Sequence, residues 1–302
     1  MIRFFAILVV ALSVSSATAF QPRTGHWNNP NESGTGMNID AQDGFYVVMT
    51  YSYTATGPAQ WYISSGQPTN NGRTFTGVLE KYRNGQCISC AYVNPAPNGV
   101  DGTITINFSS EIAATVVYPG GRVSNIQPFA FHVGPPPDGL LGQWIFVYDI
   151  ISTFAERFDF TMILPHTSGG NGIATDPGRI AGCELQVTGS IAGTVVCADA
   201  DSAGNLQNGY AFVYGLDETF NGNWISPFSG NLYAMKGFKV KSKAGYSRSA
   251  ISEAGMTAED TYAMRKVAEE GEFANVATAR ADALQSAVSQ IRSALRTFTL
   301  QP

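Results

Sequence analysis

The sequence predicts a mainly β protein with two antiparallel meander domains, each resembling an up-and-down barrel, followed by a C-terminal helical tail. Two long regions alternate apolar and polar residues with period two, and glycine- and asparagine-rich turns separate the alternating segments. Both regions open with a Gly-x-Trp pattern, at Gly25-His26-Trp27 and at Gly142-Gln143-Trp144. Beyond residue 242 the composition changes, first to a polar linker and from residue 257 to a helical pattern. These observations place two β domains before one helix.

Residues 1–19 resemble an export signal. Arg3 supplies a basic start, residues 4–14 are apolar, and Ala17-Thr18-Ala19 forms an A-x-A cleavage site. The apolar run is shorter than the roughly 20 residues that a membrane-spanning helix needs. We therefore expect cleavage after Ala19, a mature chain that begins at Phe20, and a secreted or periplasmic location without a membrane span.

The cysteines fit an oxidising compartment. All four lie beyond the predicted cleavage site, and their spacing favours two local bridges, Cys87 with Cys90 and Cys183 with Cys197. A redox centre is the alternative for Cys87-Ile88-Ser89-Cys90, but such a centre uses a helix N-terminus to lower the thiol pKa. No helical pattern follows Cys90, so a structural bridge is favoured.

The first β region covers residues 20–133. Turn residues such as Asn70-Asn71-Gly72 and Asn98-Gly99 separate its segments, and no helical pattern intervenes. Consecutive strands with short turns predict a meander, which closes into a barrel to remove exposed edges. The predicted strands are 36–41, 45–54, 60–64, 74–81, 103–108, 112–118 and 123–131.

Residues 134–138, Gly-Pro-Pro-Pro-Asp, form a stiff linker because consecutive prolines favour an extended conformation. The second β region, 139–241, has turns predicted at Asn171-Gly172, Ala203-Gly204 and Asn221-Gly222. Its predicted strands are 144–150, 156–164, 179–187, 193–198, 210–214, 222–225 and 232–240.

Residues 242–256 read as a linker, and 257–298 as the helical tail, which starts at a capping box in Thr257-Ala258-Glu259-Asp260. An apolar seam with alternating spacings of four and three needs a partner surface, because an isolated helix of this length is marginal. The partner is either this protein's own β domains, which we favour together with simple self-association, or another exported protein bound through 273–298. The seam consists of Ala277, Ala281, Leu284, Val288, Ile291, Leu295 and Phe298.

The opening of the first region resembles the tandem β-repeat of secreted bacterial proteins that carry G-x-W-x-x-P-x-x-S-G-x-G. The matching residues are Gly25, Trp27, Pro30, Glu32, Ser33, Gly34 and Gly36. The second region resembles the segment that follows such repeats, and the likeness covers most of residues 25–240. This largely uncharacterised family implies export and a β fold but no reaction. The Gly-x-Trp opening also gives an architectural analogy with lipocalins and avidins.

Candidate chemistry is sparse. His26, His132 and His166 lie far apart, which predicts no metal site and no cofactor. A triad of His26, Glu32 and Ser33 lacks the nucleophile elbow, so these residues are better interpreted as holding a tight loop. The segment 199–210 matches a calcium loop only in part and reads as a hairpin turn. The carboxylates of Asp217-Glu218 would face opposite sides of a strand. No catalytic residue is predicted.

Aromatic residues supply the remaining candidate site. Tyr51, Tyr53, Trp61 and Tyr62 occupy successive strands of the first region, where such rings either line a ligand pocket or fill a barrel interior. Low charge, with a net charge of −5, argues against nucleic acid as a partner. The leading hypothesis is an exported non-enzymatic binding protein for a small apolar molecule, a glycan or a surface protein. The alternatives are an assembly protein that oligomerises through its helix, and an exported hydrolase.

Overall fold

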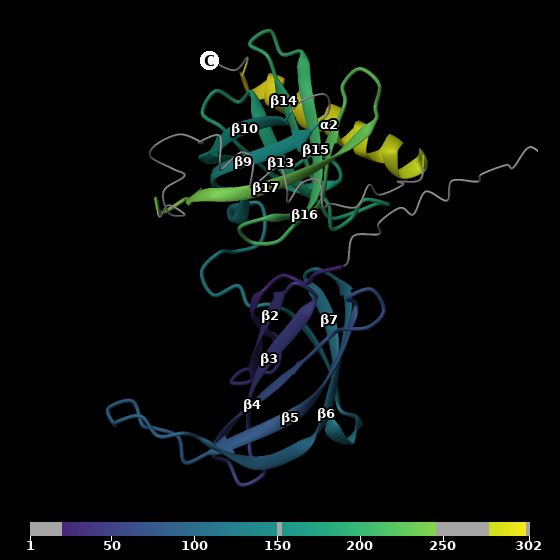
Figure 1. Ribbon diagram of the computed structural model, residues 1–302. Helices are drawn as coiled ribbons and strands as arrows, with labels where there is room; N and C mark the ends of the chain where they lie inside the picture. Colours follow the sequence, from purple (N-terminus) through teal and green to yellow (C-terminus); the bar gives the residue numbers. More distant parts are fainter. Residues whose placement is uncertain (1–19, 150–152, 246–277, 300–302) are drawn as a thin grey trace, which may run out of the picture.

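The computed structural model describes residues 20–149, 153–245 and 278–299. The predicted export signal and the first part of the predicted tail lie outside these residues. The protein is mainly β, with two antiparallel sheets and one described α-helix, as the sequence predicts (Figure 1). Two short 3-10 helices, η1 (Pro119–Gly121) and η2 (Asp138–Leu140), lie in connecting segments. No helix among the described residues has both the length and the apolar character required to cross a membrane.

The first domain is a closed eight-stranded barrel. Its strands are β1 (Gly25–Asn28), β2 (Gly36–Gln42), β3 (Phe45–Tyr53), β4 (Ala59–Gly66), β5 (Thr74–Arg83), β6 (Ala96–Ser110), β7 (Ala113–Val117) and β8 (Val123–Pro128). Each strand pairs with the next, and β1 closes the barrel against β8 through Trp27 and Pro128. The barrel therefore has no open edge between its first and last strands.

The interior of the barrel is packed with aromatic and aliphatic side chains. The rings of Trp27 and Tyr46 both contact the edge of Phe108, and Tyr46 stacks on Phe75. The Trp27 indole donates to the carbonyl of Arg23 at 2.9 Å, so its one polar group is satisfied inside the core. Trp27 thus plugs one end of the barrel.

The hairpin formed by β5 and β6 extends beyond the barrel (Figure 1). The predicted turn at Asn98-Gly99 is wrong, because both residues lie within β6. Gly99 and Gly102 have positive φ angles, and the register shifts in this stretch, so these glycines bend a continuous strand. The chain instead reverses beside the predicted Cys87–Cys90 disulfide, which is confirmed. No helix follows Cys90, so the redox interpretation lacks its structural basis.

The second domain is a curved nine-stranded sheet. Its strands are β9 (Gly142–Asp149), β10 (Thr153–Phe160), β11 (Met162–Leu164), β12 (Gly170–Thr175), β13 (Ala181–Gln186), β14 (Val195–Ala200), β15 (Leu206–Tyr214), β16 (Thr219–Ile225) and β17 (Leu232–Ser242). The order is β10-β9-β17-β16-β15-β14-β13-β12-β11. Only Thr161 separates the two edge strands along the chain, so the sheet curls towards closure.

One strand of this sheet was not predicted. Asn171-Gly172, expected as a turn, lies inside β12, where the register shifts between Gly170 and Ile173. Gly172 has a φ of +131°, which a bulge tolerates and a side chain would not. The turn signal was therefore a bulge within a strand.

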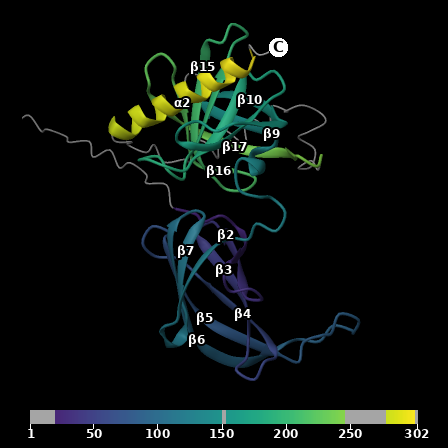
Figure 2. The ribbon, with the colours of Figure 1, turned by 180° about the vertical axis from the view of Figure 1, so that it is seen from behind.

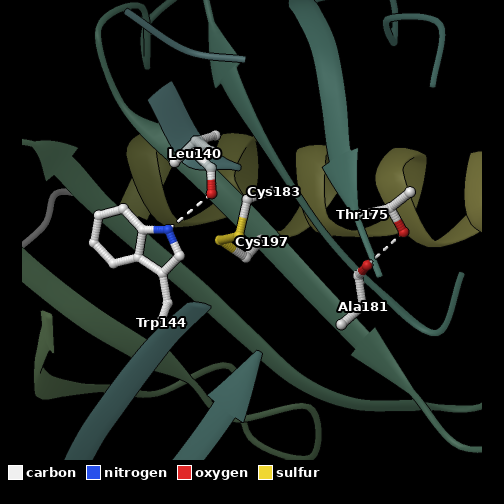
Figure 3. The surroundings of a disulfide bond; sticks show 6 residues. All are labelled: Leu140, Trp144, Thr175, Ala181, Cys183 and Cys197. Carbon is white, nitrogen blue, oxygen red and sulfur yellow. Dashed lines mark hydrogen bonds between the residues drawn. A yellow bond between two sulfur atoms is a disulfide. The ribbon is translucent and has the colours of Figure 1, made fainter. Parts of the chain in front are cut away.

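The predicted Cys183–Cys197 bridge is confirmed and joins directly opposed residues of β13 and β14. Figure 3 shows it on the inner side of the sheet next to Trp144, whose indole donates to the carbonyl of Leu140 at 2.8 Å. Trp27 and Trp144 therefore play the same part in their domains: each is a buried plug that hydrogen-bonds to a carbonyl four residues earlier.

The helix α2 (Thr278–Thr299) packs across the outer side of this sheet, over β13, β14 and β15 (Figure 2). Its predicted seam is buried there at Leu284, Val288, Ile291 and Leu295. Gly182 and Gly209 let the helix approach closely, since a Cβ on either would lie 3.1 Å from Leu295 or Val288. The sequence favours docking of the helical tail on the protein's own β domains, and α2 packs in this way.

The two domains meet at the start of β1. Arg23 donates from Nε to the carbonyl of Gly215 at 3.0 Å, and its Nη2 pairs with Asp217 at 2.8 Å. Asn221 donates to the carboxylate of Glu111 at 3.1 Å. Among the described residues, these contacts supplement the covalent link between the domains.

Candidate functional site: an outer aromatic face and a carboxyl pair

The loop between β1 and β2 contains the sequence motif. Glu32 accepts hydrogen bonds from Arg122 at 2.9 Å and from Ser124 at 3.2 Å, and the bond from Arg122 is the main cause that lowers the pKa of Glu32. Thr35 donates to the carbonyl of Glu32. These contacts hold a tight loop to β8, while His26 on β1 is exposed. They support the structural interpretation of the motif.

Two glycines of this loop are required for different structural reasons. Gly34 has a φ of +84° and lies against the hydroxyl of Tyr53. Gly36 needs no unusual φ, but a Cβ there would lie 2.8 Å from the carbonyl oxygen of Trp27. The motif therefore couples the loop to the barrel plug by close backbone contact.

Replacing Gly36 by alanine is expected to destabilise the first barrel by about 1–3 kcal/mol, because the new methyl group must displace the backbone at Trp27. Urea unfolding followed by the ¹⁹F signal of fluorotryptophan at Trp27 measures the change. Gly134→Ala is the matched control, since a Cβ on Gly134 meets no atom within 4 Å. Equal stability of the two variants would contradict the proposed contact.

The four predicted ligand residues lie on opposite sides of the barrel wall. Tyr62 faces inward, packs against the core and donates to Asp101 at 2.9 Å. Tyr51, Tyr53 and Trp61 face outward and are 40–53% exposed. Because neighbouring residues on a strand point to opposite faces, Trp61 and Tyr62 cannot line one cavity. The four residues therefore do not form the barrel pocket considered from the sequence.

The outward residues form a surface of their own, which we call the outer aromatic face: Tyr51, Tyr53, Trp61 and Tyr82. Tyr51 and Trp61 are directly opposed on β3 and β4. Tyr82 on β5 stacks on Trp61 with ring centroids 6.3 Å apart and planes 9° from parallel. The phenol of Tyr82 donates to Glu80 at 2.9 Å, which also raises the pKa of Tyr82. Three adjacent strands thus present rings to solvent.

The apolar character of this surface continues along β3. Every outward position of β3 is apolar or aromatic, from Phe45 through Val47 and Met49 to the two tyrosines. The inward positions include Thr50 and Ser52. Solvent-facing positions of a half-buried strand are usually polar, so the outer side of β3 is unusually apolar, although the rings of the outer aromatic face lie only at its C-terminal end.

A second cluster lies in the other domain, where Glu156 of β10 receives three donors. The phenols of Tyr148 and Tyr210 both donate to its carboxylate, as does the amide of Asn208 at 3.2 Å. Asn208 also donates to Asp199 at 3.1 Å. Residues from β9, β10, β14 and β15 therefore converge on two carboxyl groups.

Asp199 titrates differently from an isolated carboxyl group. Burial is the main cause that raises the pKa of Asp199 to about 7, and the negative charge of Glu156 raises it further. Burial also raises the pKa of Tyr148, and its bond to Glu156 adds to this. Asp199 consequently holds a proton in mildly acidic solution, where an isolated aspartate has lost it.

This carboxyl pair is the feature that an exported hydrolase would need, so its hydrogen bonds decide whether that alternative is supported. Both oxygens of Glu156 already accept bonds from protein donors, Oε1 from Tyr148 and Oε2 from Tyr210. The indole of Trp224 donates to the amide oxygen of Asn208 at 2.7 Å and completes the network. The amide of Asn208 also reaches both oxygens of Glu156, so this carboxylate is held by several donors and we interpret its role as structural. Oδ1 of Asp199, in contrast, is buried without a hydrogen-bond partner among the described residues.

Glu184 is a further carboxylate with a structural role. It is fully buried and accepts from the backbone of Thr167 at 2.9 Å and of Gly172 at 3.0 Å, and from the hydroxyl of Thr167. It fixes the loop before β12. Within the described residues, no group of three or more histidine, cysteine or carboxylate side chains is placed to hold a metal ion.

Comparisons with family models, with curated proteins and with solved structures find no match to this chain. The likeness to secreted bacterial β-repeat proteins therefore stays a prediction from the sequence motif.

Sequence reasoning missed Tyr82 and the Glu156 cluster. Tyr82 follows two charged residues, Glu80 and Lys81, and a period-two count from Thr74 would have placed it outward. Glu156 and Asp199 are 43 residues apart, and nothing near either of them indicates a partner.

Proposed function

We propose that this chain is an exported, non-enzymatic binding protein, and that it binds a glycan on the outer aromatic face of the first barrel. The observation that supports the proposal is the row of exposed rings across β3, β4 and β5. Large apolar side chains gathered on a rigid outer sheet surface are uncommon unless a ligand or partner covers them. The two disulfides are compatible with export.

The chemistry of the face suits a sugar chain. Its rings can pack against the C–H faces of a pyranose, while the phenol hydroxyls of Tyr51 and Tyr53 supply hydrogen bonds to sugar hydroxyl groups. Because the rings project from paired strands, little side-chain freedom is lost on binding. A chain with 14% charged residues also fits an uncharged ligand.

Two other candidates have less support. A small apolar ligand inside the first barrel competes with the aromatic core that contains Trp27, Tyr46 and Phe108. Assembly through the helical seam competes with the packing of Leu284 and Ile291 on the protein's own sheet. The outer aromatic face is free of both difficulties.

Retention on insoluble cellulose, chitin, peptidoglycan and starch tests the proposal. The mature protein is expected to bind at least one of these, and Trp61→Ala is expected to weaken that binding by about 10–100-fold, since burying a large ring contributes roughly 1.5–3 kcal/mol. Phe45→Ala is the matched control: Phe45 is 45% exposed, faces outward on β3, and lies at the opposite end of that strand from Tyr53.

The proposal fails if the wild-type protein is retained by none of the four polysaccharides. It also fails if Trp61→Ala binds as well as the wild type, or if Phe45→Ala weakens binding as much as Trp61→Ala does. A ¹H–¹⁵N correlation spectrum of each variant, compared with that of the wild type, confirms that the barrel is intact before binding is measured.

A further inference from the structure

A pocket lies between the C-terminal half of α2 and two turns of the second sheet. One turn joins β12 to β13, and the other joins β14 to β15. Its volume is about 120 Å³, the space of roughly four water molecules. We call it the arginine pocket; it is lined by Arg179, Ile180, Ala200, Asp201, Ser202, Ala203, Gly204, Arg292, Leu295 and Arg296.

Three arginines from two elements line this pocket. Arg292 and Arg296 are one turn apart on α2, and Arg179 comes from the turn before β13. Arg292 donates from Nε to the carbonyl of Gly204 at 2.8 Å, which leaves its terminal nitrogens available. Neither Arg292 nor Arg296 forms a salt bridge within the described part of the chain. Positive charge is therefore concentrated here without an ion-pair partner for the two helical arginines.

The acidic residue in the lining offsets only part of this charge. Asp201 accepts hydrogen bonds from the backbone of Ala203 at 2.9 Å and of Asn205 at 2.8 Å, so its carboxylate is engaged within its own turn. The backbone bond from Asn205 is the main cause that lowers the pKa of Asp201. Three arginines and one aspartate give the described lining a formal charge of 3 − 1 = +2. The whole chain, in contrast, has a net charge of −5.

Compensation of the helix dipole explains only part of this arrangement. Basic residues near a helix C-terminus are stabilising, which accounts for Arg296 in the last turn. It does not account for Arg179, which belongs to another element. The site of a Cβ on Gly204 lies only 2.9 Å from Nε of Arg296, so glycine at this position lets the arginine lie along the wall.

We propose that the arginine pocket binds a tetrahedral oxyanion, a phosphate or sulfate group. The planar fork of a guanidinium matches two oxygens of such a group, and arginines that approach from two sides can share its oxygens. The volume of the pocket accommodates one group of this size. The source is either the free inorganic ion or an ester carried by a larger molecule.

Titration of the full mature chain with inorganic phosphate, followed by ¹H–¹⁵N spectra at constant ionic strength, tests the proposal. Saturable shifts are expected at the amides of Ala203 and Gly204, and Arg296→Gln is expected to weaken binding about tenfold. Arg280→Gln, an exposed arginine near the start of α2, is the charge-matched control and should bind like the wild type. Arg296→Lys keeps the charge but loses the fork, and should bind with intermediate affinity.

A parallel titration with methyl phosphate identifies the source. Equal affinity indicates that the pocket accepts an ester, and loss of binding indicates the free ion. The proposal is overturned if chloride produces the same shifts as phosphate, or if Arg296→Gln, with an otherwise unchanged spectrum, binds as tightly as the wild type. Should Arg296→Gln perturb the fold, Arg292→Gln provides the second measurement.

Discussion

Replacing Ile291 by aspartate is expected to destabilise the second domain by about 3–5 kcal/mol and to release α2 from the sheet. Ile291 is fully buried in the cluster that contains Val196 and Ala211. The new carboxylate would lie among aliphatic side chains without a partner, which is among the costliest single changes in a protein interior.

Ser289→Asp is the matched control, because Ser289 lies on the exposed side of the same helix. Urea unfolding followed by ¹⁹F signals of fluorotryptophan separates the domains, since Trp144 and Trp224 report on the second and Trp27 and Trp61 on the first. The signals of the first domain should keep their wild-type midpoint. Unchanged stability of the second domain in Ile291→Asp would show that the seam does not pack on this sheet.

The second domain is expected to become more stable as the pH falls from about 7 to about 4.5. The pKa of Asp199 is about 7 in the folded protein and near 3.8 in the unfolded chain. Between these values the folded state holds a proton that the unfolded state has released, so the contribution of Asp199 to stability is complete at low pH and is lost as the pH rises towards 7. About three pH units at roughly 1.4 kcal/mol each give an upper limit near 4 kcal/mol, and partial solvent access reduces this to about 2 kcal/mol.

Asp199→Asn should remove this dependence, because the amide carries no proton that titrates in this range. Unfolding of the wild type and of the variant at pH 4.5, 5.5, 6.5 and 7.5 gives the difference directly. Asp159→Asn, an exposed change on β10, controls for the loss of one negative charge. The lowered pKa of Asp201 acts in the opposite sense, but only in more acidic solution. Parallel pH profiles for wild type and Asp199→Asn would contradict the assignment.

The strands were largely predictable because period-two patterning survives in a single sequence, but the face that each residue occupies was not. On β3 both faces carry aromatic residues: Tyr46 points inward, whereas Tyr51 and Tyr53 point outward. Only the register with β2 and β4 decides between the faces, and register depends on residues distant in the chain. For this reason the sequence predicts one candidate site that contains both Trp61 and Tyr62, although their side chains lie on opposite sides of the barrel wall.

Residues typical of turns also made the strand boundaries difficult to predict from the sequence. Asn98-Gly99 and Asn171-Gly172 have the local chemistry of a turn, and each became a bend within a strand. A glycine with positive φ serves either role, and pairing with the neighbouring strand decides which. The Glu156–Asp199 pair cannot be predicted from the sequence for a related reason. Only the curvature of the sheet brings β10 towards β14 and β15.

In the second domain β9 pairs with β17, but the chain returns after β17 as α2, which packs on the same sheet. The first domain is closed by the pairing of its first and last strands, β1 and β8, so its two ends lie side by side on one ladder. A domain built in this way is modular: further copies can be inserted before or after it without breaking a hydrogen-bonded ladder. Tandem arrays of such units, with rings displayed at regular intervals, would gain avidity for a repeating polymer through effective concentration alone.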